Sequence, residues 1–402
     1  MRVVNRREFG AVLAATATAP LPEVRGPKGH AAGLGIKPPD EPFFAALPKL
    51  MEVSGVPGVG IGVVRAGRPL WARYEGVADT STGQPVGPET LFPAASLGKP
   101  VFALAALRLA DDGRLDLDRP LKTYVPDHAP GDARGDRVTA RHVLTHSTGY
   151  PNWRSSSDQP LVPEFEPGTR FQYSGEGFYY LQRAVENIGG RGFEQFMEER
   201  LFEPLGMRSS TYSWRVDTAA RLVTGHRRGT PVRGTGRAMA TQLFQYAQDK
   251  GRPLASMTHE EIVTAIMAIS PSTGTLPNSL IPNAAGSLVT TVSDYAAFVA
   301  RVLAPATDAV EPAPATRQQM LAPQTRVNSA LSWGLGWGLE RDQGREYFWH
   351  WGDNGPFKNF VLAHLPSRSG IAVFTNGQNG LRVAEAVVAA ASGRGHFAFD
   401  WL

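Results

Sequence analysis

Strand-like patterns occupy the two ends of this chain of 402 residues, and helix-like patterns occupy its middle. Apolar residues at helical spacing dominate from residue 101 to about residue 284. We therefore expect an α+β fold in which one antiparallel sheet is built from both chain ends, flanked by helices and interrupted by a mostly helical inserted domain. The strand-like runs are 59–64, 70–76, 332–340, 346–351, 359–363 and 370–375.

The same patterns predict the domain boundaries. Residues 1–19 have the composition of an export signal, and residues 20–42 are rich in proline and glycine, which is typical of a linker. Residues 43–100 and 285–402 together form the predicted α/β sheet domain, and residues 101–284 form the predicted helical domain. The sheet domain is thus expected to combine two segments that are far apart in the sequence.

Composition excludes several classes of protein. Hydrophobic residues make up 42% of the chain, which is enough for a substantial core. No run approaches the roughly 20 apolar residues that span a bilayer, so we expect no integral membrane segment. The absence of cysteine excludes disulfides and a cysteine nucleophile. The formal charge of +4 comes mostly from residues 1–30, and no basic cluster elsewhere predicts a nucleic-acid partner.

The amino-terminal residues predict export. Asn5-Arg6-Arg7-Glu8-Phe9 precedes the mildly apolar run Gly10 to Ala19, an arrangement typical of a twin-arginine signal. Ala17-Thr18-Ala19 has the small residues of a cleavage site, but Pro20 follows it directly, so the cleavage position stays open. We expect an exported protein, periplasmic or secreted.

Ser96-Leu97-Gly98-Lys99 places a hydroxyl and an amine before the long apolar run 101–110, which predicts a buried helix. Positions i and i+3 share one face of a helix, so Ser96 and Lys99 should lie together. A lysine in dehydrated surroundings can lose its charge and accept a proton from a serine. The pair is therefore a candidate nucleophile with its base, and the alternative is a capping serine beside a solvated lysine.

Further motifs follow in a fixed order. Tyr173 follows the turn at Pro167-Gly168, and His350-Trp351-Gly352 joins two strand-like runs. Together with Ser-x-x-Lys, these motifs and their spacing resemble the serine β-lactamase and penicillin-binding-protein superfamily, nearest to its class C-like branch, which also holds family VIII esterases and D-amino-acid peptidases. The resemblance covers roughly residues 45–380 and implies a β-lactamase/transpeptidase-like fold.

The resemblance also implies catalytic roles. Ser96 would be the nucleophile, Lys99 its proton acceptor, and Tyr173 the relay that protonates the leaving group. His350 would donate a hydrogen bond to the substrate or to the Tyr173 oxygen. The backbone N–H groups of Asp353 and Ser96 would form an oxyanion hole. The alternatives are a core aromatic for Tyr173 and a structural histidine for His350.

Four other residues are candidates for substrate binding. Gly352 leaves room for close backbone approach, and Trp351 and Trp153 are expected to wall an acyl pocket. Gly175 stands where the family usually has asparagine, so a side-chain amide that contacts the lysine and the substrate is missing. This departure weakens the expectation of β-lactam recognition.

The candidates for metal binding are weak. His142 and His146 have the i, i+4 spacing of metal ligands, but no third ligand is evident, so we expect both to be structural. No metal or organic cofactor is expected.

The sequence therefore predicts a secreted serine hydrolase that forms a Ser96 acyl-enzyme and hydrolyses an ester or amide. The substrate would be a small carboxylic ester, a D-amino-acid peptide or a β-lactam, with esterase activity favoured over β-lactamase activity. The alternative, which Gly175 keeps open, is a penicillin-recognition-fold binding or sensor protein without turnover. The expected partner is a small-molecule or peptide substrate, and the sequence does not predict the oligomeric state.

Overall fold

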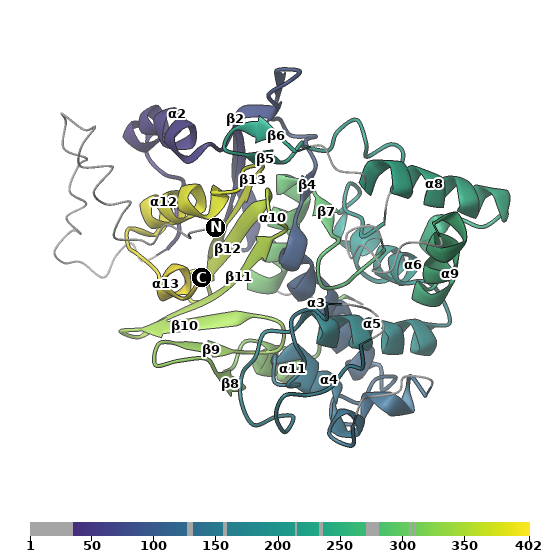
Figure 1. The fold of residues 1–402 in the computed structure, drawn as a ribbon. Coiled ribbons are helices and arrows are strands. Elements are labelled where there is room, and N and C mark those ends of the chain that lie inside the picture. Colours follow the sequence, from purple (N-terminus) through teal and green to yellow (C-terminus); the bar gives the residue numbers. More distant parts are fainter. Residues whose placement is uncertain are drawn as a thin grey trace. The chain divides into compact units, whose positions relative to one another are not determined.

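A nine-stranded antiparallel sheet joins the two halves of the chain in the computed structural model (Figure 1). Its strand order is β3-β2-β1-β13-β12-β11-β10-β9-β8. The strands are β1 (Gly58–Arg65), β2 (Arg68–Asp79), β3 (Gln84–Pro85), β8 (Thr325–Arg326), β9 (Leu331–Trp333), β10 (Gly338–Asp342), β11 (Arg345–Asp353), β12 (Lys358–His364) and β13 (Ser369–Thr375). Two small two-stranded sheets pair β4 (Phe92–Pro93) with β7 (Val289–Thr290), and β5 (His226–Arg227) with β6 (Thr230–Pro231).

The structure describes most of the chain beyond the amino-terminal segment. The described residues are 35–126, 132–155, 159–213, 215–232, 236–270, 281–304, 308 and 310–402. The predicted export signal lies outside them, as does most of the predicted linker. Helix α2 begins at Glu41, directly before the predicted end of that linker. The predicted boundaries between a sheet domain and a helical domain stay a prediction.

The pairing of β1 with β13 confirms that both chain ends build the sheet. Val59 lies opposite Thr375, and the register continues to Val64 opposite Gly370. β1 and β2, which contain the predicted runs 59–64 and 70–76, form a hairpin around Ala66 and Gly67. The α+β fold predicted from the sequence is therefore confirmed.

Helices cover both faces of this sheet (Figure 1). On one face, Val59, Ile61 and Val63 of β1 share a core with residues of α2 and α12. On the other face, α10 approaches closely because Gly60 and Gly62 have no side chain; a Cβ atom there would lie 2.6 and 2.8 Å from Val292. The alternation of large and absent side chains along β1 thus sets the distance of each helix layer.

Most helices, α3 to α9, lie between β4 and β7 in the sequence. The helices are α2 (Glu41–Ser54), α3 (Gly98–Asp111), α4 (Ala140–Leu144), α5 (Gly175–Gly189), α6 (Phe193–Met197), α7 (Glu203–Leu205), α8 (Gly236–Asp249), α9 (His259–Ile269), α10 (Val292–Leu303), α11 (Pro314–Met320), α12 (Gly380–Ser392) and α13 (Phe397–Trp401). No helix of the described chain is long and apolar enough to cross a membrane.

Helix α3 is the central buried helix of this part. Its residues 98–107 are buried without interruption, as the apolar run predicted. The 3₁₀ turn η1 (Ala95–Leu97) leads directly into it. Helix α5 begins two residues after Tyr173, because the Ser174 side chain accepts a hydrogen bond from Gly177 N–H and caps the helix.

Candidate active site

Ser96 and Lys99 lie together, as their spacing predicted. Lys99 Nζ is 3.0 Å from Ser96 Oγ and donates a hydrogen bond of 2.6 Å to the carbonyl of Ala285. Ser96 lies in η1, directly after Ala95, whose φ of 54° is left-handed and costly for a residue with a side chain. The serine thus sits on a strained turn at the start of a buried helix.

Burial of Lys99 disfavours its charged form. The side chain is 1% exposed, and no carboxylate of the described residues contributes to its pKa shift. Its Nζ lies 4.8 Å from the ring centre of Tyr173 and 5.6 Å from that of Phe178. Desolvation lowers the pKa of Lys99 well below its ordinary value of 10.5. A neutral amine has a lone pair, so Lys99 can accept the Ser96 proton.

Tyr173 is buried beside this pair. Among the described residues its hydroxyl has no hydrogen-bond partner, which argues against a core aromatic anchored by its oxygen. Burial raises the pKa of the phenol far above its ordinary value. The nearby Ser96 hydroxyl opposes this increase, although the two oxygens do not meet hydrogen-bond geometry. Tyr173 is therefore a neutral phenol at neutral pH.

His350 lies on β11 and holds a defined tautomer. Its Nδ1 donates to the Trp351 carbonyl at 2.7 Å, so the proton is on Nδ1 and the buried Nε2 carries a lone pair. Burial, with a smaller contribution from Lys99, lowers the pKa of His350 to about 3. The sequence favoured a hydrogen-bond donor at this position. The neutral tautomer instead presents an acceptor, because the single ring proton is used by the backbone.

The end of β11 presses against the turn that carries the serine. A Cβ atom at Gly352 would lie 2.1 Å from the Ala94 carbonyl oxygen, so only glycine permits this contact. Asp353 is exposed and pairs with Lys358. Trp351 packs against Tyr173, with ring centres 4.6 Å apart. The structure thus brings the His-x-Gly segment next to both η1 and Tyr173.

Trp153 and Gly175 are in direct contact. A Cβ atom at Gly175 would lie 2.6 Å from Cζ2 of Trp153 and 2.9 Å from the Asn152 carbonyl oxygen. That carbonyl accepts the N–H of Gly175, and Arg154 forms an ion pair with Glu176. The indole is therefore held where a side chain at position 175 would begin.

Sequence reasoning missed the part that His146 and Ala285 play. Ala285 supplies the acceptor for Lys99, and His146 stacks on Tyr173 with ring centres 4.1 Å apart.

His142 has a different environment, since its Nδ1 accepts the N–H of Thr139 and caps α4. No three potential ligands in the described chain are grouped in a way that could hold a metal. Histidine spacing alone gave no signal for these contacts.

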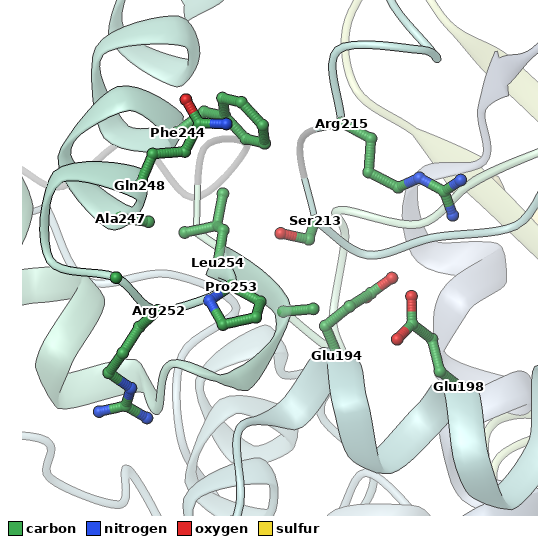
Figure 2. Close-up of a pocket in the computed structure, with 12 residues that line it drawn as sticks. Glu194, Glu198, Ser213, Arg215, Phe244, Ala247, Gln248, Arg252, Pro253 and Leu254 are labelled. Carbon is green, nitrogen blue, oxygen red and sulfur yellow. The ribbon is translucent and has the colours of Figure 1, made fainter.

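A separate cavity of about 640 Å³ contains none of the predicted site residues (Figure 2). Glu194, Glu198 and Arg215 lie on one side of it, and Phe244 and Leu254 lie on the other. Burial raises the pKa of Glu194 to about 8, and its carboxyl group already binds Thr211 and the N–H of Tyr212. This carboxyl group is therefore part of the local framework.

Comparison with known proteins gives one family. The family model described as Beta-lactamase matches residues 43–393. Esterase EstB of Burkholderia gladioli is 33% identical over 177 residues, which are 36% of this chain and 44% of that protein. The D-alanyl-D-alanine-carboxypeptidase/endopeptidase AmpH of Escherichia coli (strain K12) is 26% identical over 235 residues, 51% of this chain and 59% of that protein. The chain thus spans about half the length of these curated relatives.

Solved structures share the fold. The octameric penicillin-binding protein homologue from Pyrococcus abyssi has a TM-score of 0.67 at 21% identity, covering 88% of this chain and 77% of that chain. The D-alanine carboxypeptidase AmpC from Burkholderia cenocepacia has a TM-score of 0.64 at 20% identity, and the match covers 87% of this chain and 97% of that chain. At this level of identity the similarity concerns the fold alone.

Replacing Lys99 with methionine tests whether the folded protein holds a neutral amine. At neutral pH the unfolded chain carries a protonated lysine, whereas the lowered pKa in the folded state makes folding release a proton, at a cost in free energy. Methionine removes this cost at similar volume. We expect Lys99→Met to raise the free energy of unfolding at neutral pH, with the gain reduced by loss of the hydrogen bond to the Ala285 carbonyl, which is worth about 1 kcal/mol.

Urea unfolding at neutral pH and at higher pH measures this effect. The gain should shrink as the pH rises toward 10.5, because the unfolded lysine then also loses its proton. Lys49→Met is the control, since Lys49 is 71% exposed and should change stability little. A difference in stability between Lys99→Met and the wild type that does not change between neutral pH and pH 10.5 would contradict the release of a proton on folding.

Proposed function

Because the chain belongs to the Beta-lactamase family, we propose that it is a serine hydrolase that works through a covalent acyl-enzyme on Ser96. The observation that carries this proposal is the 3.0 Å distance between Ser96 Oγ and the buried amine of Lys99. A serine hydroxyl is a weak nucleophile until a neighbouring base removes its proton. A neutral lysine in contact with it supplies that base.

The proposed reaction has two steps. In the first, Lys99 takes the proton of Ser96, and Oγ attacks the substrate carbonyl to form a tetrahedral intermediate. The phenol of Tyr173 gives its proton to the leaving group and is reprotonated from Lys99, so the bond between acyl and leaving group breaks. In the second step, water attacks the acyl-enzyme and releases the acid.

The position of η1 against β11 supports an oxyanion site. The contact at Gly352 brings the backbone after it close to the backbone before Ser96. The N–H groups of Ser96 and Asp353 are proposed to bind the developing oxyanion, and each such donor contributes about 3 kcal/mol to lowering the barrier.

The surroundings of the serine favour an ester over a β-lactam. Trp153 takes the space beside Gly175 where an amide side chain would begin, so an apolar wall replaces a hydrogen-bonding group. His350 is neutral, since burial lowers its pKa to about 3, and it cannot attract a substrate carboxylate by charge. We therefore propose a small carboxylic ester as the preferred substrate.

Export through the twin-arginine route is part of the same proposal. It is supported by Arg6, Arg7 and the apolar run that follows them. Fractionation of cells that express the full chain tests it, with the protein expected in the exported fraction.

Mass spectrometry of the intact protein tests the nucleophile. After brief incubation with p-nitrophenyl butyrate or an organophosphonate, we expect a single adduct, and peptide mapping should place it on Ser96. Ser96→Ala is the control and should give no adduct and no turnover. An adduct on another serine, with Ser96→Ala fully active, would contradict the proposal.

Variants at positions 153 and 175 test the substrate preference. The wild type should hydrolyse p-nitrophenyl butyrate with higher kcat/KM than nitrocefin. Gly175→Asn alone should lose activity toward both, because its Cβ would meet the Trp153 indole at 2.6 Å. Trp153→Ala combined with Gly175→Asn removes the indole contact, and the loop at Asn152 must then shift to relieve the remaining 2.9 Å contact between the new Cβ and its carbonyl oxygen. The added hydrogen bond of about 1 kcal/mol should shift the ratio about fivefold toward nitrocefin.

Trp153→Ala alone is the matched control, and thermal melts check that each variant is folded. A wild type that prefers nitrocefin would overturn the proposed preference. A double variant with the same ratio as Trp153→Ala would show that position 175 does not contact the substrate.

A further inference from the structure

His146 contacts the segment around Tyr173 in three ways. Its backbone carbonyl accepts the N–H of Gln172 at 2.7 Å. Its ring Nδ1 accepts the N–H of Ser174 at 3.0 Å. Its ring packs on the Tyr173 ring with centres 4.1 Å apart and planes inclined by 30°. One residue therefore binds the backbone on both sides of Tyr173 and covers the phenol ring between them.

The phenol has little else to fix its position. Among the described residues no group meets hydrogen-bond geometry with its oxygen, although the Ser96 hydroxyl lies nearby, so ring contacts and the backbone do most of the alignment. The other rings around it are more distant, with centres at 4.6 Å for Trp351, 6.1 Å for Trp333 and 6.2 Å for His350. The contact with His146 is therefore the closest ring contact described for Tyr173.

The conformation of His146 carries a cost that this role explains. Its φ of 52° lies in the left-handed region, which is uncommon for a residue with a side chain. Such strain typically costs about 1–3 kcal/mol and persists where the surrounding structure requires it. Because Nδ1 accepts a hydrogen bond, the ring proton is on Nε2, and the fully buried ring has a single neutral tautomer.

We propose that His146 is a positioning residue that holds the Tyr173 phenol in line with Ser96 and Lys99 for proton transfer. This inference rests on the proposed acylation mechanism, in which Tyr173 relays the proton. His146 itself touches no reacting atom in this scheme, so its effect should pass through Tyr173.

A double-mutant cycle with Tyr173→Phe tests this coupling. His146→Asn keeps an oxygen acceptor near Ser174 and a residue type that tolerates left-handed φ, but it removes the ring. His146→Phe keeps a ring and removes the acceptor. Both His146 variants are made with Tyr173 intact and in combination with Tyr173→Phe. The matched control is His142→Asn, at the neighbouring histidine that caps α4.

Single-turnover acylation by p-nitrophenyl butyrate is the main measurement. When Tyr173 is intact, we expect His146→Asn to slow acylation by about 10²-fold, which is the loss typical of a misplacement near 1 Å. The value of kcat should fall and KM should stay nearly unchanged. The acylation rate of His146→Phe should lie between those of His146→Asn and the wild type. The rate of His142→Asn should equal that of the wild type. In the Tyr173→Phe background, both His146 variants should have little further effect.

The outcomes separate the two proposals. If the wild type forms no acyl-enzyme, or Tyr173→Phe is as fast as the wild type, the proposed mechanism fails and this inference with it. If Tyr173→Phe is slow but each His146 variant has the same effect in both backgrounds, or none, the mechanism stands and the positioning role is wrong. Should His146→Asn not fold, the cycle with His146→Phe decides alone.

Discussion

The burial of one lysine amine, with no carboxylate partner among the residues that the structure describes, determines how this site can work. Lys99 lies on a helix that is buried along most of its length, and its Nζ contacts a serine hydroxyl and a backbone carbonyl. Holding a charged ammonium in such a place is costly, so burial shifts the amine toward its neutral form by lowering its pKa. The residues around it follow the same rule, because His350 is neutral as well and Tyr173 keeps its proton.

The sheet brings the parts of the site together from distant segments. The hairpin β1-β2 from the front of the chain pairs with β13 from its end, and β11 lies two strands further along the sheet. Glycine at position 352 then lets β11 touch the turn that carries Ser96. A larger residue there would separate the serine from the strand, so the fold and the geometry of the site depend on the same contact.

Much of this could be predicted from local pattern. Most of the long strands and the proximity of Ser96 to Lys99 follow from residue periodicity and spacing, which act over a few positions. The predicted strand 332–340 is instead two strands, β9 and β10, because the chain turns at Gly336, whose φ is 90°. The contact of Trp153 with Gly175 could not be predicted, because it depends on how a loop is fastened to the start of α5 through Asn152. The stacking of His146 on Tyr173 is likewise tertiary, since 27 positions separate them in sequence and the sequence predicted only that His146 is structural. The tautomer of His350 depends on one backbone carbonyl that only the folded strand supplies.

The most direct test of the account compares single-turnover acylation rates of Lys99→Ala and His350→Ala with the wild type across a range of pH. With Lys99 as the base, Lys99→Ala should lower the acylation rate by about 10² to 10⁴-fold. His350→Ala should lower the acylation rate by only about 2 to 150-fold, which corresponds to one hydrogen bond of roughly 0.5–3 kcal/mol. The wild-type rate should already be at its plateau at neutral pH, because the lowered pKa of Lys99 leaves the amine neutral there. If His350→Ala were the slower variant, or if the wild-type rate rose steeply up to the ordinary pKa of lysine, a neutral Lys99 would not be the base.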